Sequence, residues 1–432
     1  MADLSINLAG IKSPNPFWLA SAPPTNSAYQ AHRAFEMGWG GFVWKTLGQP
    51  IVNVNSRYGA VQYKGKRVMG LNNIELITDR PLDENLAEIR EVKKRWPHHA
   101  VIVSLMVESK QEAWHDIVKQ VNDTGCDGIE LNFGCPHGMS ERGMGAAVGQ
   151  VPEYCAQITA WAKEAAQVPV LVKLTPNVAD IRYPGRAAQK GGADGVSLIN
   201  TINSVTGVNL DSLTPNPNVH GQSAHGGYCG PAVKPIALNM VGALTHDPEF
   251  NLPISGIGGI ETWSDAVEYI LMGATGVQVC TAAMKYGFRI VGDMIDGMSN
   301  WMDSKGFKTI AEFSGIAGQR LNDWGNLDLN YRIVANIDES KCIGCQLCYI
   351  ACEDAAHQAI RLDRPESRVP RIDEEHCVGC NLCSLVCPVE RCISMVEQNG
   401  KPHKSWNDFL NAGETPAGSY PTHSAGKAQP VL

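Results

Sequence analysis

Short apolar runs alternate with amphipathic stretches over the first three hundred residues. Eight runs, such as AVIVSLM and VPVLVKL, are rich in β-branched residues, whereas stretches such as LDENLAEIREVKKRW repeat apolar residues at helical spacing. Repeated strand–helix units predict parallel strands, and eight of them predict a closed (β/α)8 barrel. The eight predicted strands are 16–22, 40–46, 100–106, 128–132, 168–174, 195–200, 252–258 and 276–280.

An open doubly wound sheet is the alternative arrangement of such units. The barrel is favoured by the strand count and by two Gly-rich segments, SGIGGI (255–260) and GVQVCT (276–281), at the seventh and eighth strands. Barrels often bind phosphate with the loops that follow these two strands.

Two polar, Gly-rich segments interrupt the alternation, at 133–150 and 203–233. Each follows a predicted strand, so each should lie over the carboxyl-terminal mouth of the barrel. Long loops at that position are usually lids or binding loops, and a plain surface insertion is the alternative.

The pattern divides the chain into four parts. We expect a barrel over residues 1–300, a connector that packs on it over 301–335, and a small α+β ferredoxin-like domain over 336–400. Residues 401–432 are rich in Pro, Gly, Ser and His and predict a flexible tail.

Composition narrows the class of protein. The chain has 432 residues, 44% hydrophobic and 19% charged, with a net charge of −8, which disfavours a nucleic-acid-binding surface. No apolar run is long enough for a membrane span, and the start, MADLSINLAGIKSPNPF, does not read as a signal peptide. We therefore expect a cytoplasmic protein.

Eight of the 14 cysteines fall in two regular groups. Each group follows Cys-x2-Cys-x2-Cys-x3-Cys, the pattern of bacterial two-cluster ferredoxins, in which the fourth cysteine of each group ligates the other cluster. Zinc is the alternative, but zinc does not require a fourth cysteine at this spacing in both groups. The predicted ligand sets are Cys342, Cys345, Cys348 and Cys387 for one 4Fe–4S cluster, and Cys377, Cys380, Cys383 and Cys352 for the other.

Two residues depart from or stand outside the cysteine pattern. Glu353 replaces the usual proline after Cys352, which alters that turn slightly. Cys392 has no place in the pattern, and we expect it to be a buried structural residue.

Paired clusters form a path for single electrons and imply a redox centre at each end. A flavin in the barrel mouth would supply one end. Lys45 and Lys173, at the ends of the second and fifth predicted strands, direct positive charge at the mouth, where a cation would stabilise an anionic reduced flavin. Each lysine taken alone could also be a solvated strand end.

Cys135 directly follows the fourth predicted strand, in the segment NFGCPHG. It can be a buried structural cysteine, a nucleophile, or a general acid on a mobile loop. No evident Cys/His/Asn set supports the nucleophile, and a thiol with a reference pKa near 8.5 suits proton donation. The neighbouring Gly and Pro favour the loop.

The segments ELNFGCPHGMSERGMG, NNIELI, LVKLTPNV and INT, together with the eight cysteines, resemble the dihydropyrimidine dehydrogenase family. The resemblance covers roughly residues 5–400. It is strongest to the bacterial subunit type that combines an FMN barrel with a C-terminal ferredoxin domain.

The resemblance implies a residue set for each ligand. Gly134 stands where the mammalian enzymes have serine, which affects one polar contact to substrate or flavin. Cys135 would be the general acid. Uracil presents alternating donors and acceptors, and carboxamides offer both. FMN would be held by Ser21, Lys45, Thr46, Lys173, Gly230, Gly258, Gly259, Cys280 and Thr281, and the pyrimidine by Asn73, Glu75, Asn132, Gly134, Asn200 and Thr201.

The implied reaction is reversible reduction of uracil or thymine, with hydride transfer from FMN to C6 and protonation of C5 by Cys135. No Gly-x-Gly-x-x-Gly follows a strand and opens a helix, so we expect NAD(H) and FAD to bind a separate iron–sulfur subunit that feeds electrons through the clusters. The alternatives are a dihydroorotate dehydrogenase-like enzyme acting on another unsaturated ring, and an electron-transfer module without substrate chemistry.

Overall fold

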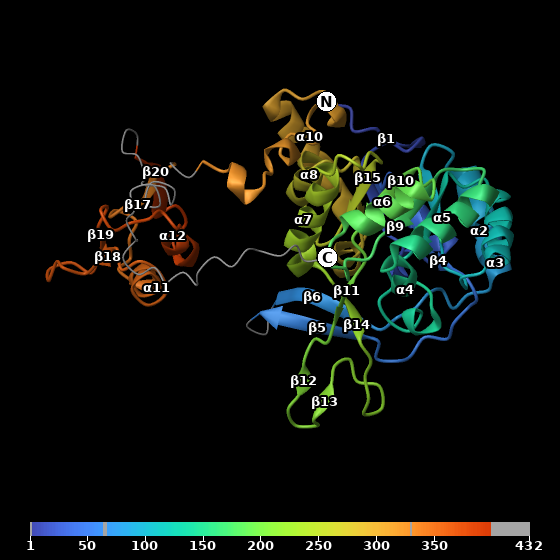
Figure 1. Ribbon diagram of the computed structural model, residues 1–432, viewed down its shortest axis with the longest axis horizontal. Helices are drawn as coiled ribbons and strands as arrows, with labels where there is room; N and C mark the ends of the chain where they lie inside the picture. Colours follow the sequence, from blue (N-terminus) through green and yellow to red (C-terminus); the bar gives the residue numbers. More distant parts are fainter. Residues whose placement is uncertain (1, 64–66, 329–330, 399–432) are drawn as a thin grey trace, which may run out of the picture. The chain divides into compact units, whose positions relative to one another are not determined.

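The computed structural model describes residues 2–63, 67–328 and 331–398 and divides the chain into two compact units, 1–321 and 322–432 (Figure 1). The tail predicted over 401–432 lies outside the described residues. Within the described ranges, no helix is both long and apolar enough to cross a membrane.

The first unit is a closed barrel of eight parallel strands, as predicted. The strand order around the barrel is β10-β15-β16-β3-β4-β7-β8-β9, so neighbours in sequence are neighbours in space. The strands are β3 (Phe17–Leu19), β4 (Gly41–Leu47), β7 (Ala100–Leu105), β8 (Gly128–Asn132), β9 (Val170–Lys173), β10 (Gly195–Leu198), β15 (Ile254–Ile257) and β16 (Gly276–Val279).

Helices follow the strands and cover the barrel (Figure 1). Local signals set their ends: Ser27 caps the first helix, which ends at Gly38 in a left-handed conformation, and Thr262 forms a capping box with Asp265. The helices are α1 (Ala28–Met37), α2 (Leu82–Arg95), α3 (Gln111–Asn122), α4 (Ala146–Gly149), α5 (Pro152–Ala165), α6 (Arg182–Lys190), α7 (Lys234–Thr245), α8 (Trp263–Leu271), α9 (Thr281–Tyr286) and α10 (Ile290–Lys305).

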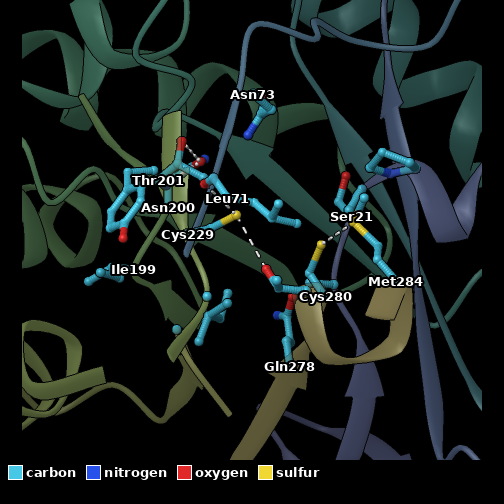
Figure 2. Close-up of a pocket in the computed structure, with 18 of the residues that line it drawn as sticks. Ser21, Leu71, Asn73, Ile199, Asn200, Thr201, Cys229, Gln278, Cys280 and Met284 are labelled. Carbon is cyan, nitrogen blue, oxygen red and sulfur yellow. Dashed lines mark hydrogen bonds between the residues drawn. The ribbon is translucent and has the colours of Figure 1, made fainter. Parts of the chain in front are cut away.

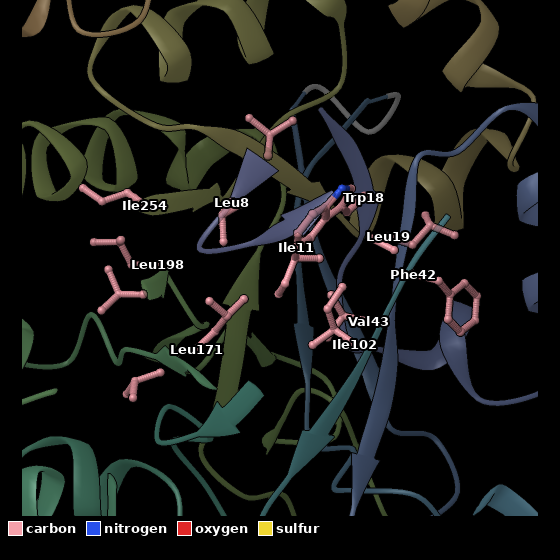
Figure 3. Close-up of a cluster of buried hydrophobic side chains, with 14 of the residues drawn as sticks. Leu8, Ile11, Trp18, Leu19, Phe42, Val43, Ile102, Leu171, Leu198 and Ile254 are labelled. Carbon is pink, nitrogen blue, oxygen red and sulfur yellow. The ribbon is translucent and has the colours of Figure 1, made fainter. Parts of the chain in front are cut away.

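Apolar side chains form the core of the barrel. Strands such as β4 and β7 are buried along their whole length. Such continuous apolar runs are typical of parallel strands covered on both faces. A hairpin of β1 (Ile6–Leu8) and β2 (Ile11–Ser13) precedes the barrel. Its Ile11 lies among Val43 and Ile102 of the strands (Figure 3).

An antiparallel sheet of order β11-β14-β6-β5 accompanies the barrel, and the sequence did not predict it. It joins β5 (Tyr58–Tyr63) and β6 (Arg67–Asn73) to β11 (Ile202–Ser204) and β14 (Gly226–Cys229). The segment expected to be one long loop, 203–233, therefore contributes paired strands, including the small hairpin β12 (Val208–Asn209) and β13 (Thr214–Pro215).

The second unit is small and nearly symmetric. Helices α11 (Leu347–Ala355) and α12 (Leu382–Val386) each follow a cysteine loop. Strand β17 (Ile333–Ile337) pairs with β20 (Ile393–Glu397), and β18 (Ile360–Arg361) pairs with β19 (Arg371–Ile372). Before this unit, Gly315 and Ala317 donate backbone hydrogen bonds to the end of α8. The domain limits at 300 and 335 remain a prediction.

Candidate active site

One large cavity opens at the carboxyl ends of the barrel strands, the face where barrel enzymes place their active sites. Including the open solvent at its mouth, this space measures about 1210 Å³. Side chains from separate elements surround it (Figure 2). The sequence-predicted residues that line it are Ser21, Lys45, Thr46, Asn73, Glu75, Asn132, Cys135, Lys173, Asn200, Thr201, Gly230, Gly258, Gly259, Cys280 and Thr281.

Gly134 is the one predicted mouth residue that is not part of this lining. It packs instead against Asn200: a Cβ atom placed on Gly134 would lie 2.3 Å from the Cβ atom of Asn200. The absence of a side chain at 134 therefore lets the Asn200 side chain take its position.

A chain of hydrogen bonds orients the amides. Asn200 Nδ2 donates to Asn132 Oδ1 at 3.0 Å, and Asn132 Nδ2 donates to Thr46 Oγ1 at 3.0 Å. The Thr46 hydroxyl also pairs with the hydroxyls of Ser104, at 3.0 Å, and Ser21, at 3.1 Å. The ends of β3, β4, β7, β8 and β10 are thus joined through polar side chains at the cavity wall.

Glu75, which follows β6, is the centre of a buried ionic group. It pairs with Lys45 and accepts a hydrogen bond from the Tyr58 hydroxyl, and Arg57 Nη1 lies 3.7 Å from its carboxylate. Burial raises the pKa of Tyr58, and its bond to Glu75 raises it further. The sequence assigned Lys45 and Glu75 to different ligands, and it missed Tyr58, the first residue of the unpredicted strand β5, and Arg57, which directly precedes it.

A second buried carboxylate, Glu130, lies inside the barrel. Its Oε1 atom is 3.8 Å from Lys173 Nζ, and its Oε2 atom accepts hydrogen bonds from Ser197 Oγ (2.7 Å) and Gln278 Nε2 (3.2 Å). Among the described residues, Glu130 Oε1 and Gln278 Oε1 are buried without a hydrogen-bond partner. Polar residues inside otherwise apolar strands were the available signal for these side chains.

Cys135 is buried, 9% exposed, in the loop after β8. Its thiol donates to His137 O at 3.5 Å, while Ala146 N donates to Cys135 O at 3.0 Å. His137 Nε2 in turn donates to Glu75 O at 3.1 Å, which joins this loop to the Glu75 group. Burial raises the pKa of Cys135 to about 11, so the protonated thiol dominates at neutral pH.

Three glycines with left-handed backbone form one edge of the cavity. Gly230, Gly258 and Gly259 have φ values of +99°, +131° and +70°. A Cβ atom on Gly259 would lie 2.9 Å from both Gly230 O and Lys234 Cβ, so the close approach of the two loops requires glycine at this position. Beside them, Thr281 Oγ1 donates to Cys229 Sγ at 3.3 Å (Figure 2).

The second unit contains two smaller cavities lined by cysteines. The first is lined by Cys342, Cys345, Cys348 and Cys387, and also by Cys392. The second is lined by Cys352, Cys377, Cys380 and Cys383. The fold therefore gathers the two sets of four that the spacing predicted, each with one cysteine from the opposite group.

Comparison with known proteins identifies the family. Residues 3–302 match the dihydroorotate dehydrogenase family, and residues 335–395 match the 4Fe–4S dicluster domain. The chain is 42% identical to the NAD-dependent dihydropyrimidine dehydrogenase subunit PreA of Escherichia coli K12, over 83% of this chain and 87% of that protein. The chain belongs to the dihydropyrimidine dehydrogenase family.

Two other relatives extend this relation. The chloroplastic dihydropyrimidine dehydrogenase (NADP(+)) of Arabidopsis thaliana is 41% identical over 72% of this chain and 76% of its own length. The catalytic subunit of dihydroorotate dehydrogenase B (NAD(+)) of Pyrococcus abyssi is 36% identical over 73% of this chain and 99% of its own. As a dihydropyrimidine dehydrogenase family member the chain is an oxidoreductase, and the predicted fold of barrel plus dicluster domain is confirmed.

Proposed function

We propose that this chain interconverts uracil or thymine and the 5,6-dihydropyrimidine, with FMN in the barrel mouth and two 4Fe–4S clusters in the second unit. The observation that carries the proposal is the single cavity that combines an amide cluster, a buried thiol and a side-chain-free glycine edge. The names of the E. coli and Arabidopsis relatives support the same substrate class.

The cavity residues fit a flavin. Because Gly230, Gly258 and Gly259 carry no side chains of their own, their backbone N–H groups would be available to a phosphate. The buried, unpartnered Gln278 Oε1 can accept a hydrogen bond from a ring N–H, and Lys173 offers a cation. Ser21, Lys45, Thr46, Cys280 and Thr281 would complete the site. When bound, FMN supplies hydride chemistry to the substrate ring.

The amide set fits a neutral pyrimidine. Asn73, Asn132 and Asn200 each carry both a donor and an acceptor, which matches the alternating N–H and C=O groups of the ring edge. The bond that Asn200 Nδ2 donates to Asn132 Oδ1 and the bond that Thr201 N donates to Asn200 Oδ1, at 2.8 Å, hold these groups in place. Glu75 supplies an additional acceptor. These residues would therefore recognise a flat, uncharged ring.

Cys135 would supply the proton that C5 of the ring receives after hydride transfer to C6. Because its pKa is raised to about 11, Sγ carries a proton across the physiological range and can donate it to C5 of the ring. In the oxidative direction the same sulfur would receive that proton. Cys135 packs with Ile77, Met106 and Met139 in a buried apolar cluster, which accounts for the low exposure of its thiol.

The second unit fits paired iron–sulfur clusters. Each cavity presents its predicted set of four cysteines, three from one loop and one from the opposite group, and Cys392 also lines the first cavity. The left-handed Gly344 and Gly379 allow each loop to turn tightly between its first two cysteines. The bound clusters would supply single-electron transfer between a partner and the barrel.

A separate subunit that binds FAD, NAD(H) and iron–sulfur clusters would deliver the electrons. The E. coli relative is named as a subunit of an NAD-dependent enzyme, and this sequence has no dinucleotide-binding fingerprint. The clustered thiols suit the reducing cytoplasm.

A dihydroorotate-type substrate is the second candidate, favoured by the P. abyssi relative. Its carboxylate would require a free cation. Among the described lining residues the Lys and Arg side chains are Lys45 and Lys173, and each faces a buried carboxylate, Glu75 or Glu130. The electrostatics of the cavity therefore favour a neutral ring.

The test is an anaerobic titration of the purified holoprotein. Dihydrouracil should bleach the visible flavin absorption, and dihydroorotate at the same concentration should leave it unchanged. Bleaching by dihydroorotate alone would replace the proposal by the second candidate. Absence of flavin, or zinc in place of iron, would overturn it altogether.

A further inference from the structure

The two halves of the second unit are built alike, so equivalent positions can be compared directly. Gln346 and Asn381 both have left-handed backbone, with φ of 63° and 66°, and each is followed at once by a helix. After the fourth cysteine of each group, the chain returns to a strand that begins with isoleucine, Ile360 in one half and Ile393 in the other.

The halves differ at the residue before that strand. Ala359 precedes β18 and lines the second cavity, together with the four cysteines of that set. Cys392 precedes β20 and lines the first cavity. The first cavity therefore has five lining cysteines, whereas the second has four and a methyl group at the equivalent place.

Hydrogen bonds to shared backbone carbonyls link Cys392 with Cys342 and Cys387, which line the same cavity. Asp338 O accepts hydrogen bonds from Cys342 N (3.0 Å) and from the Cys392 thiol (3.7 Å), and Asp338 N donates to Cys392 O at 2.8 Å. Val389 O accepts from Cys392 N at 3.2 Å and from the Cys387 thiol at 3.5 Å. Cys392, 3% exposed, thus shares a hydrogen-bond acceptor with each neighbour.

A buried free cysteine often serves only as a small apolar side chain. Here, however, Cys392 lines a cavity whose other four cysteines are the predicted iron ligands. A thiol in this place offers a donor that iron binds strongly.

We propose that Cys392 is a reserve ligand of the first cluster that can take the place of Cys387. In this exchange the iron–sulfur bond to Cys387 breaks and that sulfur gains a proton, while Cys392 loses its thiol proton and bonds the same iron. No electron is transferred. The first cluster would therefore survive loss of Cys387, whereas the second, with Ala359 at the equivalent position, would not survive loss of Cys352.

Matched variants of the full chain test this by iron and sulfide analysis and electron paramagnetic resonance after anaerobic reconstitution. Cys387→Ala should keep both four-iron clusters, and Cys387→Ala/Cys392→Ala should keep only the second. Conversely, Cys352→Ala should lose the second cluster, and Cys352→Ala/Ala359→Cys should regain it. Cys392→Ala alone should retain both clusters.

A three-iron cluster, or no first cluster, in Cys387→Ala would overturn the proposal if that variant folds, as judged by circular dichroism. If it does not fold, the Cys352→Ala pair decides: failure of Ala359→Cys to restore the second cluster would overturn the proposal. The inference rests on the proposed iron–sulfur function, and the wild-type chain separates the two. Wild-type protein without iron defeats the function, whereas wild-type protein with both clusters and a failed rescue defeats only the reserve ligand.

Discussion

The barrel mouth and the cysteine unit assemble their chemistry in opposite ways. The mouth residues extend from Ser21 to Thr281 and come from the ends of different strands, so only the closed barrel brings them together. The proposed cluster ligands all lie between Cys342 and Cys387, in two groups with fixed local spacing. A change in the mouth should therefore have a graded effect, whereas loss of a cluster ligand that has no reserve, such as Cys345, should abolish one cofactor.

The largest expected effect separates the two regions. Cys345→Ala removes a ligand of the first cluster, so turnover with NADH and the partner subunit should fall to background. Dihydrouracil should still bleach the flavin, because the mouth is intact. Stopped-flow spectroscopy checks both halves, with Cys126→Ala, a buried cysteine outside either site, as the control. Loss of both activities would show that the regions are not independent.

Within the mouth, Cys135→Ala should have the next largest effect. It should retain flavin and clusters but lose about 10²–10⁴-fold in turnover, the usual contribution of a general acid. Steady-state kinetics with uracil measures this, and Cys155→Ala controls for loss of a buried thiol. Turnover equal to wild type would remove Cys135 from the mechanism.

The pH dependence of Cys135 labelling tests its protonation state separately. Its pKa of about 11, against about 8.5 for an ordinary thiol, leaves on the order of 10²-fold less thiolate at neutral pH. Alkylation by iodoacetamide, followed by peptide mapping, should therefore rise only above about pH 10. The denatured chain is the control. A rise centred on the ordinary thiol pKa would contradict the role of burial.

The same contrast explains what the sequence could predict. Continuous apolar runs such as 100–106 identify buried parallel strands, and regular cysteine spacing predicts the two sets of four cysteines that line the two cavities, because both signals are local. The sheet that contains Tyr58 was missed because β5 and β6 lack a continuous apolar run and pair with a segment far away in the sequence, as Asn73 does with Gly227. Glu130 was missed because one polar residue in a strand does not reveal its partners.

Glu130→Gln should have a moderate effect on the bound flavin. The change removes a negative charge 3.8 Å from Lys173 while a neutral amide can keep the bond to Ser197. A more positive environment stabilises added electrons, by about 1–2 kcal/mol for a partly screened charge. The flavin midpoint potential should therefore rise by about 30 mV, measured by spectroelectrochemistry. A fall would contradict this reasoning, and Glu36→Gln, at the exposed surface, should leave the potential unchanged.

Among the changes in the barrel mouth, substitution of Gly134, which does not itself line the cavity, should have the smallest effect. A methyl group added by Gly134→Ala would lie 2.3 Å from Asn200 Cβ, so Asn200 must shift and its bond to Asn132 must weaken. Loss of one such bond costs about 0.5–1.5 kcal/mol, which should raise KM for uracil by about 2–10-fold and change kcat less.

The Gly134 effect should depend on its neighbour. In an Asn200→Gly background the added methyl group meets no side chain at 200, so Gly134→Ala should have little further effect on KM. Gly292→Ala, whose added Cβ would meet nothing within 4 Å, is the matched control. An equal effect in both backgrounds would mean that residue 134 acts on the ligand directly and not through Asn200. Residue 134 would then act through its own local position, as the cysteines of the second unit do, and not through a contact formed by the closed barrel.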